Sequence, residues 1–300
     1  MSNYRGRLAP SPTGYLHLGH ARTFWMAHHR ARSTGGKLVF RNEDLDFQRC
    51  KPDFVQATYD DLHWLGLDWD EGPDSGGLFA PYSQSGRRNI YLQCWRRLRD
   101  GGFIYPCSCS RKDLERALQA PHEEEDDEIP YPGTCRAKII TAKQWDSPAG
   151  ISWRFRVPDH EEISFHDLCF GPQQFTAGRD FSDFLVWRRD DVPAYQLAVV
   201  ADDEAMQITE VVRGADLLKS TARQLLLLRA LECSEPAYFH CRLLRDQNNL
   251  RLAKRHDALS LRTMRSQGAD PAALRKKFVE ELGSSQYWAT ARQPATKTYC

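Results

Sequence analysis

The sequence predicts an α/β protein built on a parallel sheet, and three observations support this fold class. A strand-like segment near the N-terminus leads through a turn rich in proline and glycine into a helical pattern. Strand-like and helical segments then alternate along the first third of the chain, as they do in βαβ units. The chain has 41% hydrophobic and 27% charged residues, a composition that excludes disordered, collagen-like and coiled-coil proteins.

The first part of the chain has the pattern of a Rossmann-type nucleotide-binding fold. The expected elements are a strand over 5–10, a helix over 20–32, a strand over 37–46, and helices over 51–67 and 85–100. Gly35 and Gly36 end the first helix, and Pro52 begins the second. Leu38 and Phe40 alternate on one face of the second strand. Strand, turn, helix, strand and helix in this order are typical of a parallel sheet with crossover helices.

An insertion and the rest of the sheet are expected to follow. Cysteines, prolines and the acidic run 123–128 interrupt the pattern. Beyond them we expect strands over 151–157, 162–168, 193–200, 207–214 and 238–244, an apolar helix over 220–232, a polar turn over 246–249, and a helix beginning near Asp270-Pro271. The predicted segments are 1–104, the first half of the catalytic domain; 105–150, the insertion; 151–240, the second half; and 241–300, a small helical C-terminal subdomain.

Charge and targeting signals narrow the class of protein. The N-terminus has no apolar stretch that could serve as a signal peptide, and no apolar run is long enough to span a membrane, so we expect a cytoplasmic protein. The net charge is only +1, yet residues 241–300 hold twelve basic and five acidic residues. Such an asymmetry often marks a nucleic-acid-binding face. We expect a monomer.

The turn before the first helix has the features of a phosphate-binding site. It runs through Pro10 and Gly14 to His17, Gly19 and His20 at the beginning of the helix. A helix N-terminus offers unpaired N–H groups to a phosphate, and a glycine there lets a flat ring approach the backbone. Two imidazoles three residues apart can donate to phosphate oxygens whose charge grows during displacement. The alternative interpretation is a helix that happens to begin with two histidines.

Three cysteines have the spacing of a structural zinc site. Cys107 and Cys109 form a Cys-x-Cys pair, and Cys135 follows after the acidic stretch. The nine cysteines are irregularly spaced, which argues against a disulfide framework. On chemistry alone the fourth ligand is His122, because imidazole is a good zinc ligand and this residue lies in the same loop. The alternative is a set of unrelated thiols.

Four motifs resemble those of one enzyme family. Residues 7–20, RLAPSPTGYLHLGH, are similar to the first signature of the class I aminoacyl-tRNA synthetases in the form carried by the glutamyl branch. The segments RNEDLD (41–46) and VVRGADLL (211–218) resemble two further motifs of that branch. RLAKR (251–255) lies where the lysine-bearing second signature is expected. It departs from the family pattern at Arg251, usually lysine, and at Ala253, usually serine, while Lys254 matches the lysine that meets the triphosphate.

The resemblance implies roles for individual residues. It places glutamate against Arg7, Leu8, Ala9, Pro10, Ser11, Glu43, Tyr195 and Arg213, and ATP with Mg²⁺ against His17, Gly19, His20 and Lys254. His17, His20 and Lys254 would be catalytic. Glu43 would hold the substrate ammonium, and Arg7 and Arg213 a carboxylate, which is also what an α-amino dicarboxylic acid requires. The resemblance indicates Tyr131 as the fourth zinc ligand, so Tyr131 and His122 both remain candidates.

The short tail directs the functional prediction. Only 45 residues follow Arg255, too few for the anticodon-binding part of a full glutamyl-tRNA synthetase. The chain resembles a stand-alone family of this size, the glutamyl-queuosine tRNA(Asp) synthetases. This implies a ligase-type enzyme that forms glutamyl-adenylate and transfers glutamate to queuosine in the anticodon of tRNA(Asp). Alternatives are a truncated synthetase charging a tRNA 3′ end and a catalytically idle binding paralogue. The basic residues expected to contact RNA are Arg262, Arg265, Arg275 and Lys276.

Overall fold

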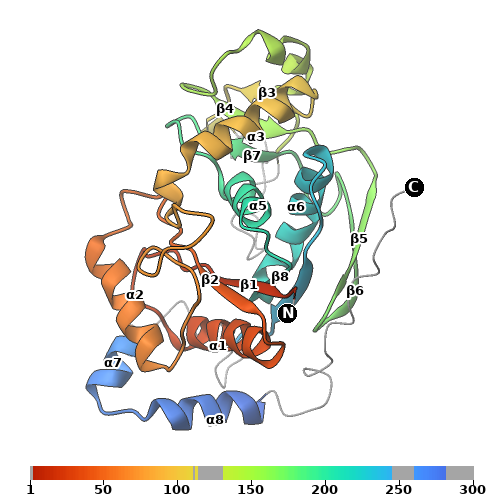
Figure 1. The fold of residues 1–300 in the computed structure, drawn as a ribbon. Helices are drawn as coiled ribbons and strands as arrows, with labels where there is room; N and C mark the ends of the chain where they lie inside the picture. Colours follow the sequence, from red (N-terminus) through yellow and green to blue (C-terminus); the bar gives the residue numbers. More distant parts are fainter. Residues whose placement is uncertain (1–2, 111, 114–130, 245–259, 282–300) are drawn as a thin grey trace.

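The computed structural model describes residues 3–110, 112–113, 131–244 and 260–281 (Figure 1). In chain order its helices and strands are β1 (Arg5–Leu8), α1 (Leu18–Ser33), β2 (Lys37–Phe40), α2 (Pro52–Trp64), α3 (Arg88–Asp100), β3 (Ile104–Cys107), β4 (Ser152–Phe155), β5 (Glu162–Asp167), β6 (Gly171–Thr176), β7 (Phe184–Trp187), α5 (Tyr195–Ala205), β8 (Glu210–Gly214), α6 (Leu218–Ala230), β9 (Ala237–Cys241), α7 (Leu261–Ser266) and α8 (Pro271–Glu281). Three 3₁₀ helices are η1 (Gln84–Gly86), η2 (Arg136–Gln144) and η3 (Ala215–Leu217).

Parallel strands form the centre of the fold, as the sequence predicts. β1 pairs with β2 in parallel, and β8 pairs with β9 in parallel. β1 lies beside β8, where the backbone N–H of Thr209 donates to the carbonyl of Arg5 at 2.9 Å. In Figure 1, α1 lies below β1, β2 and β8, whereas α5 and α6 lie above them. Helices therefore cover both faces of the sheet, which leaves the carboxyl ends of its strands as the natural place for a ligand.

Antiparallel pairing occurs in two places around this centre. β5 pairs in parallel with β9 at one residue and antiparallel with β6 along its whole length. A separate antiparallel sheet has the order β3-β4-β7. Because β3 lies at the beginning of the predicted insertion and β4 just after its end, this sheet brings the two ends of the insertion together. β3, β6 and β7 are not among the predicted strands.

One predicted strand is wrong. The apolar segment 193–200 is expected as a strand, but residues 195–205 form α5. This helix is buried on nearly all sides, including the side chains of Gln196, Asp202 and Asp203. Because apolar and polar side chains alike are buried, the helix shows no regular polar stripe, and its short apolar run 197–201 cannot be distinguished by periodicity from a buried strand. The second strand is also shorter than predicted, since β2 ends at Phe40.

The core has two main clusters of apolar side chains. One contains Trp95 on α3, Trp153 on β4 and Leu225 on α6. The other packs α1 against the strands and contains Trp25 and Phe40. The eight cysteines within the described residues are free thiols. Among those same residues, no helix has both the length and the apolar composition needed to cross a bilayer.

Candidate active site

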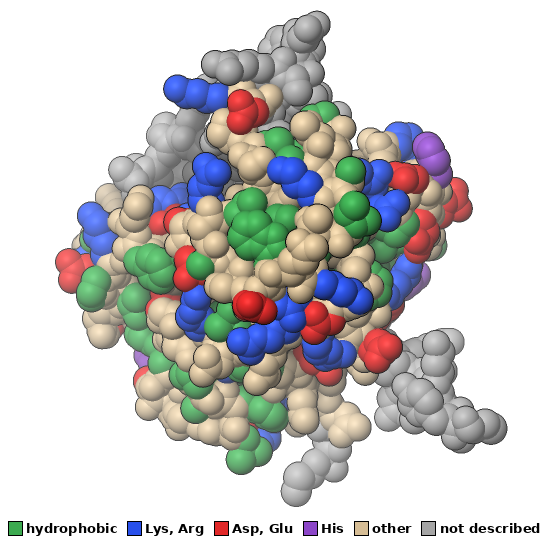
Figure 2. Space-filling model, turned by 90° about the horizontal axis from the view of Figure 1, so that it is seen from above, with side chains coloured by type: hydrophobic (Ala, Val, Ile, Leu, Met, Phe, Trp, Pro, Cys, Tyr) green, Lys and Arg blue, Asp and Glu red, His purple; other side chains and the backbone are tan. Residues whose placement is uncertain are grey.

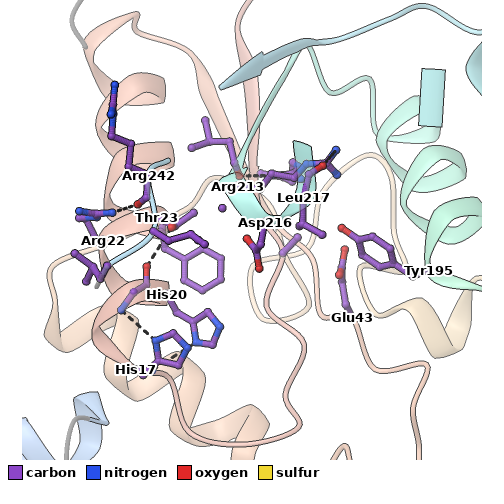
Figure 3. Close-up of a pocket in the computed structure, with 18 residues that line it drawn as sticks. His17, His20, Arg22, Thr23, Glu43, Tyr195, Arg213, Asp216, Leu217 and Arg242 are labelled. Atoms are coloured by element: carbon purple, nitrogen blue, oxygen red, sulfur yellow. Dashed lines mark hydrogen bonds between the residues drawn. The ribbon is translucent and has the colours of Figure 1, made fainter. Parts of the chain in front are cut away.

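A pocket of about 190 Å³ lies at the carboxyl ends of β1, β2 and β8 (Figure 3). Its lining comes from five parts of the chain: Arg7, Ala9, His17, Gly19, His20, Arg22, Thr23, Phe24, Glu43, Tyr195, Val212, Arg213, Gly214, Asp216, Leu217, Arg242, Leu243 and Leu244. In Figure 3, His17 and His20 lie on one side of the pocket and Glu43 and Tyr195 on the other, with Arg213 and Asp216 between them. Most of the predicted site residues that the structure describes therefore meet in one pocket.

The two predicted histidines cap the helix that faces the pocket. His17 is the N-cap of α1, and its Nδ1 accepts a hydrogen bond from the backbone N–H of Gly19 at 3.1 Å. His20 Nδ1 accepts from the backbone N–H of His17 at 3.5 Å, and the two rings stack with centroids 3.6 Å apart. A Cβ on Gly19 would lie 3.0 Å from the His17 ring, so this position has little room for a larger residue. The helix N-terminus and both imidazoles are thus presented to the pocket.

A buried network of charges lies beneath Glu43. The fully buried Arg41 donates from Nη2 to Glu43 Oε1 at 2.9 Å and from Nη1 to Asp203 Oδ1 at 2.6 Å. Asp202 also lies within 3.8 Å of Arg41 Nε. Burial raises the pKa of Glu43, while Arg41 and Arg7 oppose that rise. Glu43 therefore has one fixed oxygen on Arg41 and belongs to a pocket wall that can receive a cation.

Arg7 spans the pocket floor from β1. Its Nη1 donates to the carbonyl of Val212 at 2.8 Å, and its Nε lies 3.5 Å from Asp203 Oδ1. This Nε is a buried donor without a hydrogen-bond acceptor in the described part of the chain. Burial lowers the pKa of Arg7, and Asp203 counteracts this. The guanidinium is thus incompletely satisfied by the protein, as a group awaiting a ligand would be.

Arg213 is a buried cation whose hydrogen-bond partners among the described residues are all uncharged acceptors. Its guanidinium donates to His240 Nε2 at 3.1 Å, Gln224 Oε1 at 2.8 Å, Thr221 Oγ1 at 2.7 Å and the carbonyl of Leu217 at 3.4 Å. The ion pairs found among the described residues do not include Arg213. A buried guanidinium that no carboxylate neutralises favours an anionic ligand strongly. The sequence did not single out His240, Gln224 or Thr221, because their contact with Arg213 is tertiary.

Of the remaining predicted residues, some line the pocket and others do not. Tyr195, at the first position of α5, lines it and is 40% exposed. Leu8 does not line the pocket, because its side chain is part of the core. Pro10 contributes its carbonyl, which accepts from the backbone N–H of Glu43 at 3.0 Å, and Ser11 is exposed in the turn before α1. Lys254, with Arg251 and Ala253, lies outside the described residues.

The three predicted zinc-ligand cysteines also come together. The Sγ atoms of Cys107, Cys109 and Cys135 all lie within 4.8 Å of one another. The hydroxyl of Tyr131 lies 3.5 Å from Cys107 Sγ and 3.8 Å from Cys109 Sγ. Burial acts to raise the pKa of Cys135, but hydrogen bonds, the strongest from Tyr131, lower it to about 6. This donor set fits a small thiophilic cation. His122, the other candidate ligand, lies outside the described residues.

The fold and the pocket define a class I aminoacyl-tRNA synthetase catalytic domain. Residues 3–290 match the family model described as tRNA synthetases class I (E and Q), catalytic domain. Within this class the chain belongs to the glutamyl-Q tRNA(Asp) synthetase family. It is 48% identical over 268 residues to the glutamyl-Q tRNA(Asp) synthetase of Symbiobacterium thermophilum, an alignment that covers 89% of this chain and 82% of the relative.

Two further similarities agree with this assignment. The glutamyl-Q tRNA(Asp) synthetase of Nitratidesulfovibrio vulgaris is 49% identical over 274 residues, which cover 90% of this chain and 83% of the relative. The crystal structure of the glutamate-tRNA synthetase from Elizabethkingia anophelis superposes with a TM-score of 0.70 at 28% identity. That match covers 88% of this chain and 54% of the other, so the chain spans about half the length of the solved synthetase.

Proposed function

We propose that this protein activates L-glutamate with ATP and transfers the glutamyl group to queuosine in the anticodon of tRNA(Asp). The observation that carries the proposal is the pairing, in one pocket, of an unneutralised buried guanidinium on Arg213 with the carboxylate of Glu43. An α-amino dicarboxylic acid has the complementary charges, an ammonium and two carboxylates. The choice of acceptor is supported by the names of relatives that align over most of their own length.

The substrate contacts follow from the charges of the pocket. Glu43 binds the α-ammonium, and Arg7 and Arg213 bind carboxylate oxygens. Tyr195 and the turn residue Ser11 supply further hydrogen bonds. Aspartate is shorter than glutamate by one methylene, a difference worth about 1–3 kcal/mol in a simple pocket. Discrimination between the two amino acids therefore depends on the distance between the ammonium and carboxylate subsites.

Activation occurs beside the N-terminus of α1. A carboxylate oxygen of glutamate attacks the α-phosphorus of ATP, the bond to the bridging oxygen breaks, and pyrophosphate leaves. His17, His20 and Lys254 stabilise the charge that develops on the phosphate oxygens, and Gly19 leaves room for the nucleotide. Mg²⁺ bound with ATP neutralises phosphate charge. A queuosine hydroxyl then attacks the acyl carbon of the adenylate, and AMP leaves.

A small aromatic and basic surface that includes Tyr15, close in sequence to the pocket residue His17, is suited to the RNA loop. Tyr15, 43% exposed, lies two residues before His17, and the guanidinium carbon of Arg262 lies 5.1 Å from its ring centroid. Phe54 meets the same ring edge-on at 5.1 Å, and Lys51 lies beside Phe54. Stacking surfaces with nearby cations are how proteins bind splayed single-stranded bases. We call these four residues the Tyr15 platform.

The other basic residues of the C-terminal segment differ in how free they are to bind RNA. Arg275 donates to the carbonyl of Leu65 at 2.7 Å and packs over Gly66, so it has a structural task at the end of α2. Arg265 and Lys276 are exposed on α7 and α8. Figure 2 views the molecule from above, away from α7 and α8 at the bottom of Figure 1, and that upper face carries basic and acidic side chains interspersed. The Tyr15 platform is therefore the stronger candidate for the RNA contact.

We propose that zinc is held by Cys107, Cys109, Cys135 and Tyr131. A bound zinc supplies a structural cross-link, which here would join the end of β3 to residues 131–135. Tyr131 already accepts a hydrogen bond from the backbone N–H of Cys135 at 2.8 Å, so its oxygen is held in place among the thiols.

Two other functions are less well supported. Charging of a tRNA 3′ end is the reaction named for the glutamate-tRNA synthetases, but the two higher-identity relatives carry the glutamyl-Q name. A catalytically idle paralogue that only binds an amino acid would not need to keep His17, Gly19 and His20 in the same pocket as the amino-acid contacts.

The activation step is tested by amino-acid-dependent exchange of pyrophosphate into ATP. We expect exchange with glutamate and little with aspartate or glutamine. Glu43→Gln should raise the Michaelis constant for glutamate by about a hundredfold, because a charge-assisted bond to the ammonium is lost. Lys254→Ala should lower the exchange rate far more than it raises that constant. Exchange that needs no amino acid, or that prefers another one, would contradict the proposal.

A further inference from the structure

We infer that His240 and Asp167 position the Arg213 guanidinium for the substrate carboxylate while leaving its positive charge uncancelled. This inference rests on the proposed glutamate site. His240 Nδ1 lies 2.6 Å from Asp167 Oδ2, and its Nε2 lies 3.1 Å from Arg213 Nε. The side chains of His240 and Asp167 are fully buried. The three residues therefore form a linear chain from the core to the pocket.

The sheet sets this geometry. Arg213 on β8 and His240 on β9 are direct partners in a parallel ladder, and Asp167 is the last residue of β5 on the other side of β9. Neighbouring strands of a sheet hold such side chains side by side. The backbone N–H of His240 also donates to Asp167 Oδ2 at 3.1 Å. The hydrogen-bonded series of Asp167, His240 and Arg213 is thus held by adjacent strands rather than by loops.

Hydrogen-bond chemistry fixes the tautomer of the imidazole. An arginine N–H only donates, so Nε2 of His240 must be the acceptor. The ring proton is then on Nδ1, where it donates to Asp167. Asp167 Oδ1 also accepts the backbone N–H groups of Cys169 at 3.0 Å and Phe170 at 2.8 Å, contacts that hold the carboxylate in place beside the imidazole. Burial lowers the pKa of His240, and Arg213 and Arg7 add to this, although Asp167 opposes it.

The neutral imidazole of His240 separates the carboxylate of Asp167 from the guanidinium of Arg213. A carboxylate in direct contact with Arg213 would orient the guanidinium but would also neutralise it. With His240 between them, Arg213 gains a fixed acceptor on Nε and keeps its charge for a ligand. Thr221 and Gln224 hold the two Nη atoms in the same way, since both are uncharged. All side-chain acceptors that orient this cation are therefore neutral.

Two substitutions of His240 separate positioning from packing. In His240→Asn the short amide would lie near the place of Nδ1 and keep a bond to Asp167, whereas in His240→Gln the longer amide would reach the place of Nε2 and keep an acceptor for Arg213. We expect His240→Asn to raise the Michaelis constant for glutamate in pyrophosphate exchange by about tenfold or more, with the constant for ATP unchanged. His240→Gln keeps the acceptor for Arg213 but loses the bond to Asp167, so it should raise the constant for glutamate by only about threefold.

If either variant folds poorly, the inference can still be tested by NMR on the wild-type protein. Nitrogen NMR of protein labelled in histidine should show His240 neutral at pH 7, with its proton on Nδ1. A cationic ring, or a proton on Nε2, would overturn the inference. So would equal glutamate constants for the two variants. If the wild type shows no glutamate-dependent exchange, the proposed function fails and the inference fails with it; normal wild-type exchange with unaffected variants contradicts the inference alone.

Discussion

Arg41 and Glu43, two residues apart after β2, form a buried ion pair with an Nη2–Oε1 distance of 2.9 Å. The same guanidinium contacts Asp203 on α5 at 2.6 Å. One cation thus joins the segment after β2 that carries Glu43 to the helix that carries Tyr195. Because Arg41 is fully buried, its removal would leave carboxylates in the core without their main counter-ion.

We therefore expect Arg41→Met to lower the free energy of unfolding by about 3–5 kcal/mol. Chemical denaturation followed by circular dichroism measures this change. The matched control is Arg49→Met, since Arg49 pairs with Asp46 at 2.6 Å but its side chain is 71% exposed. The control should cost about 0–1 kcal/mol. Equal effects of the two substitutions would show that the buried network does not stabilise the fold.

The cluster of Cys107, Cys109 and Cys135 predicts that the purified protein contains bound zinc. Cys135→Ser should reduce bound zinc, measured by mass spectrometry of purified protein, from about one equivalent to a small fraction, and should lower the thermal midpoint. Cys233→Ser, at a thiol outside the cluster, should change neither. Tyr131→Phe should weaken zinc binding without abolishing it. Wild-type protein that takes up no zinc would refute the site.

Asp61 on α2 predicts a pH dependence of stability. Burial raises its pKa from 3.8 to about 6, while Arg265 and Arg262 on α7 oppose the shift and Asp60 adds to it. The folded state then holds a proton that the unfolded state has lost, so the free energy of unfolding falls as the pH rises from about 4 to about 6. Above that range the buried charge persists as a cost.

Asp61→Asn removes this titration. The variant should gain stability relative to the wild type between about pH 4 and pH 7 when denaturation is measured across that range. The control is Asp53→Asn, at an exposed carboxylate on the same helix. Its free energy of unfolding should change with pH in the same way as that of the wild type. Parallel stability curves for the wild type and Asp61→Asn would contradict the assigned burial effect.

The Tyr15 platform predicts an effect on RNA alone. Tyr15→Ala should weaken tRNA binding by about tenfold, because base stacking on an aromatic ring is worth about 1–3 kcal/mol. Tyr15→Phe keeps the ring and should bind normally. Glutamate-dependent pyrophosphate exchange should be the same in both variants. A Tyr15→Ala protein with wild-type tRNA affinity would remove the platform from the account.

The sequence was sufficient to predict which strand ends would meet, but not what supports them. Arg7 and Arg213 lie near the carboxyl ends of β1 and β8, and Glu43 follows β2. Parallel strands bring such positions to one edge, so their convergence could be predicted. The contacts of Arg41 with Asp203 and of His240 with Asp167 join residues far apart in the chain, and local pattern carries no signal for them. The helix over 195–205 was missed because its polar residues, such as Asp202, are buried.

The most direct test of the central claim is transfer of labelled glutamate to two pools of tRNA, one from cells that make queuosine and one from cells that cannot. We expect ATP-dependent label only on the pool that contains queuosine. Equal label on both pools would contradict the account and return the protein to charging of a 3′ end.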